Sequence, residues 1–188
     1  SVRSGARPEA GPRSGERDLD RALALRPDHV SVYGLTVEPH TALGRWRDRG
    51  EVAESPEGNY EREFLLAHST LSAAGYEHYE VSNYALPGAQ ARHNTSYWRH
   101  VPYGALGPSA HRFDGARRSW NVAPYAEWLR RVRGGIDPTD GFEVLTADEL
   151  ESERIYIGLR TTDGLVVSGD LEARTSRWRD AGWAAIVD

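Results

Sequence analysis

The 188-residue sequence contains no cysteine and no methionine, and all 23 of its basic residues are arginine. Without cysteine the chain forms no disulfide, no thiolate zinc site and no iron–sulfur cluster with its own ligands. The initiator methionine is also missing, and the sequence stops at Asp188 just after an apolar turn. We therefore expect a fragment of a longer protein.

The sequence also lacks a long hydrophobic run. No stretch approaches the roughly 20 apolar residues that cross a bilayer, and no charged-then-apolar signal segment opens the chain. We therefore expect a cytoplasmic protein without a membrane span. The formal net charge of −5 argues against a general nucleic-acid binder.

The first half of the chain has the pattern of a βαβ unit. Val30–Val37 is a near-continuous apolar run, typical of a strand buried on both faces. Asn59–Ala74 is a long amphipathic helix with Gly75 at its C-terminal cap, and Tyr76–Ser82 alternates as a second strand. The pattern predicts strands at Val30–Thr36 and Tyr76–Ser82 that are adjacent and parallel.

Helices dominate the rest of the prediction. A short helix is expected at 18–25, and three more at 124–132, 146–160 and 171–181. Pro124 opens one of them, and Thr146 caps the next ahead of acidic residues. The side chains predicted to be buried in the helix after Thr146 are Leu150, Ile155, Ile157 and Leu159. The Gly/Pro-rich segment 133–141 is predicted to be a hinge between two packed units.

The most unusual side chains collect between Gln90 and Asn121. Histidines, amides and large amphipathic aromatics replace the Val, Ile and Leu of an ordinary strand, and glycines between them allow close backbone approach. The three clusters are His93-Asn94-Thr95-Ser96-Tyr97-Trp98, Tyr103 to His111, and Arg118-Ser119-Trp120-Asn121. Imidazoles beside broad aromatic faces predict a site for a flat, metal-bearing or aromatic ligand.

The run His93 to Trp98 resembles the HNxxYW box of the radical-SAM haem chaperones (HemW-type), relatives of the oxygen-independent coproporphyrinogen III oxidases. Further matches follow in the family's order and cover nearly everything from Asp18 onward. They are Asp28 to Thr36, GYEHYEVSNYALPG at 75–88, GPSAH at 107–111, SWN at 119–121 and GLRTTDG at 158–164.

The resemblance implies an α/β fold: the C-terminal part of a partial (β/α) radical-SAM barrel, followed by a small helical region. The expected parts are a disordered lead-in over residues 1–17, the C-terminal half of the partial barrel over 18–135, and a truncated helical region over 142–188. Family members bind haem, S-adenosylmethionine and a [4Fe–4S] cluster. They deliver haem to acceptor proteins, for which respiratory haem proteins, some of them membrane-associated, are expected here.

The resemblance also assigns residues. It implies that His93 binds the haem iron and that Asn94, Tyr97 and Trp98 complete the haem motif. Thr36 and His111 fall where family members line the S-adenosylmethionine site.

The family's CxxxCxxC cluster motif is absent, so these 188 residues by themselves are expected to be catalytically inactive. Half a barrel would also leave a sheet edge and apolar surface uncovered, which predicts aggregation or dependence on a partner.

The residues leave blander interpretations open. Tyr97, Trp98 and Trp120 also fit core aromatics rather than a stack on a porphyrin. His93 also fits a loop histidine satisfied by hydrogen bonds, and the small residues before His111 also fit close packing.

Sharper alternatives use other side chains. One is a divalent metal site gathered from distant residues: His78, Glu80, His93, His100 and His111. Another is a barrel glycoside hydrolase with Glu38 and Glu80 as paired carboxylates, which release of reducing sugar would reveal. A coproporphyrinogen oxidase-like enzyme and a non-functional remnant are the remaining possibilities.

Overall fold

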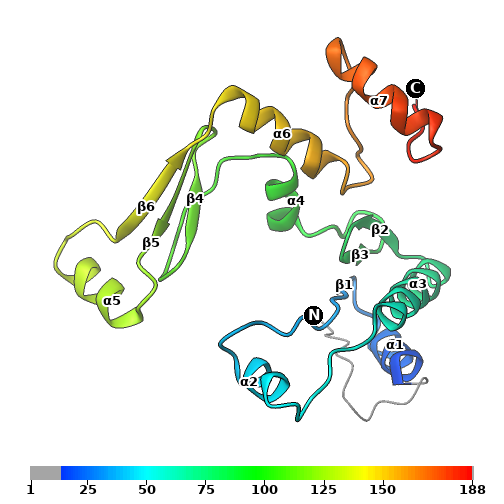
Figure 1. The fold of residues 1–188 in the computed structure, drawn as a ribbon, viewed down its shortest axis with the longest axis horizontal. Coiled ribbons are helices and arrows are strands. Elements are labelled where there is room, and N and C mark those ends of the chain that lie inside the picture. Colours follow the sequence, from blue (N-terminus) through cyan, green and yellow to red (C-terminus); the bar gives the residue numbers. More distant parts are fainter. Residues whose placement is uncertain (1–13, 188) are drawn as a thin grey trace.

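The computed structural model describes residues 14–187, which form two small antiparallel sheets and seven helices. The sheet of β1 (His29–Ser31), β2 (Glu77–Glu80) and β3 (Asn83–Ala85) packs with α1 (Ser14–Ala24) and α3 (Glu57–Ala73) at one end of the molecule (Figure 1). The sheet of β4 (His111–Phe113), β5 (Arg117–Asn121) and β6 (Thr139–Val144) lies at the other end with α5 (Tyr125–Arg133). Helix α4 (Arg92–Trp98) lies between them, and α6 (Ala147–Gly158) runs from β6 back toward the first sheet. This mixed α/β architecture agrees with the predicted fold class, and no closed barrel is formed by the described residues.

The hydrophobic core joins α1 (Ser14–Ala24) and α3 (Glu57–Ala73) to the first sheet. Its buried members are Leu19, Val30, Ala67, Leu71, Tyr76 and Tyr84. The predicted helix at 18–25 is confirmed, although it begins earlier, at Ser14. The prediction of a disordered lead-in falls mostly on residues 1–13, which lie outside the described residues.

The end of α3 shows how local sequence directs the chain into this core. Gly75 adopts φ +89°, a left-handed conformation that glycine tolerates best. Its N–H donates to the Ser72 carbonyl at 3.0 Å, and the N–H of Tyr76 donates to the Leu71 carbonyl at 3.1 Å. This pair of hydrogen bonds is the Schellman motif. The apolar contact that usually accompanies the motif is between Leu71 and Tyr76, which both belong to the core. The prediction of a Gly75 cap is confirmed.

The topology of the first sheet corrects the predicted strand pairing. Strands β1 (His29–Ser31) and β2 (Glu77–Glu80) share one sheet and run in the same direction, because both pair antiparallel to β3 (Asn83–Ala85). They are not adjacent, however, since β3 lies between them. Strand β1 also ends at Ser31 rather than Thr36.

A tight turn after β2 explains this difference. The buried carboxylate of Glu80 accepts hydrogen bonds from the Ser82 N–H at 3.2 Å and from the Asn83 side-chain amide. These bonds reverse the chain within three residues and direct β3 into the sheet centre, where all three of its residues are buried. The sequence NYALPG is rich in turn-forming residues, so its pattern indicates a loop rather than a buried strand.

The second sheet was not predicted. It is an antiparallel meander of β4 (His111–Phe113), β5 (Arg117–Asn121) and β6 (Thr139–Val144), with α5 (Tyr125–Arg133) between β5 and β6. The inward residues of β5 are polar, Ser119 and Asn121, so the usual alternation of apolar and polar residues is missing. The predicted hinge at 133–141 contains the turn into β6 and the start of that strand.

The remaining helices are α2 (Ala42–Asp48), which was not predicted, α6 and α7 (Asp170–Asp180). Thr146 and Glu149 form a reciprocal capping box at the start of α6, which confirms the predicted cap. The predicted burial of its apolar side chains is wrong for Leu159, which is 53% exposed, and only partly met by the others. No helix in residues 14–187 is long and apolar enough to cross a membrane.

Candidate functional site

The HNxxYW motif forms most of the short helix α4. His93 and Tyr97 are one helical turn apart, so their side chains meet on one face. The Tyr97 hydroxyl lies 3.0 Å from His93 Nε2, and the two rings meet edge to face with centroids 4.9 Å apart. Tyr103 continues the row, with its ring centroid 4.6 Å from that of Tyr97. His93 and Tyr97 are both exposed, which makes this face accessible to a ligand.

The donor set at His93 suits an axial ligand of haem iron. A ligating imidazole uses one nitrogen for the metal while a second group holds the other nitrogen and orients the ring. Here the Tyr97 hydroxyl holds Nε2, and Nδ1 has no hydrogen-bond partner within residues 14–187. His93 therefore has one nitrogen free for a metal. Its assignment as the haem ligand stays a prediction.

The opposite side of α4 carries an unusual set of buried polar atoms. Within the described part of the chain, the buried side-chain polar atoms without a hydrogen-bond partner are Asn94 Nδ2, Thr95 Oγ1, Trp98 Nε1 and His100 Nε2. A buried polar group left unsatisfied costs about 1–3 kcal/mol. All four belong to the motif or to the residues beside it, so the uncompensated cost is concentrated at this helix. A ligand or a further polypeptide segment that supplied partners would recover it.

A cavity of about 590 Å³ is lined by two of the residues that carry these atoms, Trp98 at the end of α4 and His100 just after it. The apolar side chains Leu150, Leu165 and Val166 line it from α6 and the segment after it. Its volume is in the range of small-molecule and cofactor sites. Two arginines also reach this cavity: Arg99, which pairs with Asp163 at 2.8 Å, and Arg154, which pairs with Glu151 at 2.7 Å.

His100 has a strained backbone conformation just after the C-terminal end of α4. Its φ of +52° lies in the left-handed region, which non-glycine residues adopt at a cost. The N–H of His100 donates to the Tyr97 carbonyl at 3.1 Å and the N–H of Val101 to the Ser96 carbonyl at 3.0 Å, so His100 occupies the position that glycine usually fills in a Schellman cap. Such strain is often found at functional sites. Sequence reasoning treated His100 only as one of five dispersed metal ligands.

The other motif segments contact one another in pairs. Thr162 donates its N–H to the Tyr79 carbonyl at 3.1 Å, and its hydroxyl lies 3.3 Å from the same oxygen. Thr161 forms an isolated bridge with Glu80. In the second sheet, the Asn121 amide donates to the Gly107 carbonyl at 2.8 Å. The segments GYEHYEVSNYALPG and GLRTTDG, and likewise GPSAH and SWN, are therefore in contact.

Thr36 and His111 are not brought together by any contact in the described residues. Thr36 is exposed in the segment after β1, whereas His111 is exposed on β4, with its ring centroid 5.8 Å from that of Trp120. Strands β1 and β4 belong to different sheets, which lie apart in Figure 1. Their place at an S-adenosylmethionine site therefore stays a prediction. Trp120 contacts His111 rather than the aromatic row on α4.

Two alternatives from the sequence are not supported. No group of three or more His, Asp or Glu residues within 14–187 could hold a metal, so the proposed site of His78, Glu80, His93, His100 and His111 is wrong. Glu80 is only 4% exposed and accepts bonds within its own turn, whereas Glu38 lies exposed in a loop. A glycoside hydrolase would need both carboxylates at one substrate.

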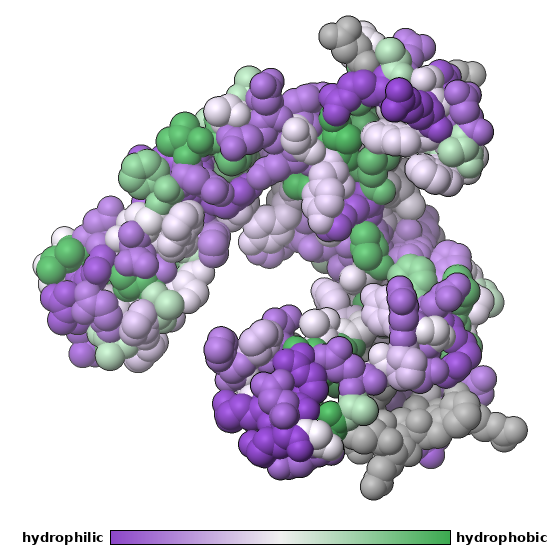
Figure 2. Space-filling view, in the orientation of Figure 1, coloured by the Kyte–Doolittle hydropathy of each residue, from purple (hydrophilic) through white to green (hydrophobic). Residues whose placement is uncertain are grey.

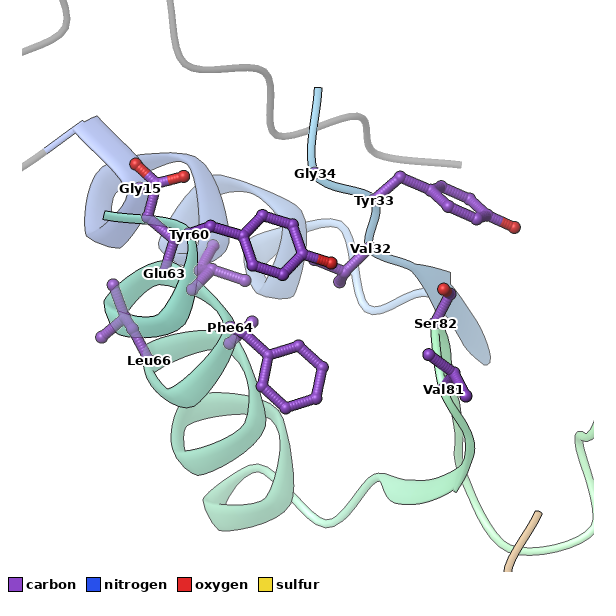
Figure 3. Close-up of a pocket in the computed structure, with 12 residues that line it drawn as sticks. Gly15, Val32, Tyr33, Gly34, Tyr60, Glu63, Phe64, Leu66, Val81 and Ser82 are labelled. Atoms are coloured by element: carbon purple, nitrogen blue, oxygen red, sulfur yellow. The ribbon is translucent and has the colours of Figure 1, made fainter. Parts of the chain in front are cut away.

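A second hollow lies beside the first sheet and is too small for a cofactor. Tyr60 and Phe64 of α3 point toward Val32 and Gly34 in Figure 3. A Cβ at Gly34 would collide with the Tyr60 ring, so a larger residue here would displace that ring. The cavity volume of about 40 Å³ is that of an apolar packing space rather than a ligand site.

Apolar side chains remain on the surface, as predicted. Figure 2 shows hydrophobic patches among the hydrophilic residues, including one near the junction of β6 and α6. Phe142 and Val144 of β6 are 57% and 64% exposed. A surface of this kind favours contact with further polypeptide.

Comparisons with known sequences and with solved structures both find proteins similar to this chain, whereas no family model matches it. The chain is 40% identical over 149 residues to the "Heme chaperone HemW" of Mycobacterium tuberculosis, covering 79% of this chain and 38% of the relative. It is 37% identical over 161 residues to the protein of the same name from Synechocystis, covering 84% of this chain and 39% of the relative. The chain thus spans about two fifths of the length of these relatives.

A solved structure shares the fold. The coproporphyrinogen III oxidase HemN from Escherichia coli, described as a radical SAM enzyme, matches with a TM-score of 0.63 at 15% identity. The match covers 92% of this chain and 41% of that chain. At this identity the likeness concerns the fold alone.

Proposed function

We propose that this chain, which belongs to the HemW-type family of haem chaperones, carries the part of such a chaperone that holds haem before its transfer to an acceptor protein. In this proposal haem is the molecule that is carried, and α4 forms its binding site. The proposal depends chiefly on four buried polar atoms without a partner among the described residues: three belong to the HNxxYW motif in α4, and the fourth is in His100, just after the helix.

The side chains around α4 fit the chemistry of haem. Haem presents an iron that takes axial nitrogen ligands, two broad apolar faces, and carboxylates that pair with arginine. His93 offers an accessible nitrogen on the exposed face of α4, where Tyr97 holds its other ring nitrogen. On the opposite side of the helix, Trp98, Arg99, His100 and Arg154 line the cavity. In this proposal His93 is the iron ligand, Tyr97 orients its ring, and Asn94 and Trp98 complete the motif from the buried side of α4.

The other family cofactors fit these residues less well. A [4Fe–4S] cluster needs thiolates, and the 188 residues contain no cysteine. Thr36 and His111, proposed near S-adenosylmethionine, are on separate sheets. We therefore propose no radical chemistry for the chain by itself, and S-adenosylmethionine and the cluster would require residues outside this sequence. An oxidase-like activity, the runner-up, is supported only by likeness of fold.

A haem titration tests the proposal. Haem added to the chain should give a shifted Soret band, which His93→Ala should lose, because the axial ligand controls the electronic state of the iron. Tyr97→Phe should weaken binding by roughly 10- to 100-fold, because the imidazole loses the group that orients it. His100→Asn tests separately whether the histidine beside the cavity contributes to haem binding.

His40→Asn is the matched control. His40 and His100 both have positive φ, +65° and +52°, and asparagine tolerates that conformation. His40 lies in a loop outside the motif. If neither His93→Ala nor His100→Asn changes the haem spectrum or the haem affinity relative to this control, α4 does not form the haem-binding site. Loss in the His100 variant alone would place the axial ligand in the cavity instead.

The recipients of haem follow from the same proposal. Respiratory haem proteins, including membrane-associated ones, are the acceptors that we propose, with the chaperone in the cytoplasm. Mixing haem-loaded chain with an apo-cytochrome should move the Soret band to that of the acceptor. No transfer above the rate of free haem would contradict delivery while leaving haem binding intact.

A further inference from the structure

A pair of histidines outside the haem motif has the geometry of a metal-chelating site. His68 lies on α3 and His78 on β2, and their Nδ1 atoms are 3.0 Å apart. The turn at Gly75 brings the two residues together, because β2 runs back along α3 after the helix ends. We propose that His68 and His78 bind one late first-row divalent cation in a cis arrangement, with water completing its coordination.

The surroundings of His78 prepare its Nδ1 to act as a ligand. Its Nε2 lies 3.2 Å from the Val81 carbonyl, an acceptor, so Nε2 carries the proton and Nδ1 presents a lone pair. This backbone carbonyl has the role that carbonyls and carboxylates have behind metal-binding histidines. The ring is further fixed by Tyr84, stacked at a centroid distance of 4.1 Å and an interplanar angle of 14°.

His68 supplies the adjustable ligand. With His78 Nδ1 unprotonated, the 3.0 Å contact requires a proton on His68 Nδ1. Transfer of that proton to Nε2, which gives the other neutral tautomer, frees the second lone pair for the metal. His68 is exposed on α3, so its ring can turn toward an ion and the ion can enter from solvent.

The two nitrogens lie at a separation that one ion can bridge. With metal–nitrogen bonds of about 2.05 Å, nitrogens 3.0 Å apart subtend about 94° at the ion, close to the angle between neighbouring ligands in square-planar and octahedral complexes. Because the exposed His68 ring can turn, the separation of about 3.3 Å that a tetrahedral ion needs is also within reach. The preference between metals therefore follows the general order of affinities, and Cu²⁺ should bind more tightly than Zn²⁺.

The pair cannot hold haem iron between its two nitrogens. Axial ligands of a porphyrin lie on opposite faces of the ring, about 4 Å apart across the metal. The proposed site is therefore independent of the haem function, and neither result depends on the other.

The test uses Cu²⁺ and the whole chain. Pulsed electron paramagnetic resonance counts coordinated imidazoles through their remote nitrogens, and calorimetry gives the affinity. The parent chain should show two imidazoles on one Cu²⁺. His68→Ala and His78→Phe should each leave one coordinated imidazole. Each should also weaken Cu²⁺ binding by at least roughly 10- to 100-fold, the loss that follows removal of a group that supports a metal ligand. His78→Phe keeps an aromatic ring against Tyr84, so equal thermal unfolding midpoints will show that the fold is preserved.

His40→Asn again serves as the control and should retain two imidazoles. One coordinated imidazole or none in the parent would overturn the proposal. Two imidazoles that persist in both His68→Ala and His78→Phe would also overturn it, because they would belong to another pair of histidines.

Discussion

Arg118 of β5 forms an ion pair with α6, a helix that lines the cavity. Replacing Arg118 tests how much this pair contributes to the free energy of unfolding. Its guanidinium donates to Glu153 of α6 through two nitrogens, at 2.9 and 3.1 Å, and to Glu143 of β6 at 2.8 Å. The side chains of Arg118 and Glu153 are only 26% and 28% exposed. The Glu153 hydrogen bonds are the main reason that the pKa of Arg118 lies above its ordinary value.

The expected cost of breaking this pair is moderate. A hydrogen bond to a charged group contributes about 1.5–3 kcal/mol when it is shielded, whereas an exposed ion pair contributes about 0–1 kcal/mol. The Arg118–Glu153 pair is shielded on most of its surface, so we expect Arg118→Met to lower the free energy of unfolding by about 1–3 kcal/mol. Glu143 and Glu153 would then face each other without their shared cation.

A double-mutant cycle isolates the pair. The free energies of unfolding of the parent, Arg118→Met, Glu153→Gln and the double variant are measured by urea denaturation. We expect a coupling of about 1–2 kcal/mol. Arg130→Met, which breaks the exposed pair with Glu127 on α5, is the control and should cost less. A coupling below about 0.3 kcal/mol, within the additivity of unrelated sites, would show that α6 is held by its other contacts.

Three further predictions concern the scaffold. Burial, and secondarily the Glu80 carboxylate, raises the pKa of Tyr84 to about 12. The unfolded chain therefore loses this proton first, and the free energy of unfolding should fall between about pH 10 and pH 12 by more in the parent than in Tyr84→Phe; equal declines would contradict this. Leu71→Ala, at a fully buried position, should cost about 2–5 kcal/mol in urea denaturation, and a cost no larger than that of Leu65→Ala, at an exposed position, would be evidence against the core. Thr146→Ala removes the capping box of α6 and should cost about 0.5–2 kcal/mol by thermal unfolding, whereas Thr146→Ser should be nearly neutral; equal effects would contradict the cap.

Five of the seven helices in residues 14–187, α1, α3, α5, α6 and α7, could be predicted because their signals are local. The cap at Gly75 and the capping box at Thr146 lie within a few residues of the helix ends that they define. Strand order could not be predicted in the same way, since the position of β3 depends on Glu80 bonding to the residues that follow it. A buried carboxylate has no pattern that distinguishes it from an exposed one in sequence.

The motif at 93–98 can be located in the sequence, but its geometry cannot be predicted from it. The structure shows the motif as a helix with His93 and Tyr97 in contact, and the roles of its residues stay a prediction. The role of His100 could not be anticipated, because its left-handed backbone and its place at the cavity depend on α6 and on residues after it. Thr36 and His111 were associated by resemblance alone, and no local signal could show that their strands belong to different sheets.

The bonds from Thr162 to Tyr79 tie the segment after α6 to the first sheet across 83 positions of sequence. The pairing of β1 with β3 also joins distant residues, but it is a ladder of several backbone bonds, whereas this junction has the two bonds of Thr162 and one isolated bridge. The Arg99–Asp163 pair beside it is exposed and adds little. Few buried contacts therefore hold this junction, and we expect its amides to lose hydrogen-exchange protection before those of either sheet.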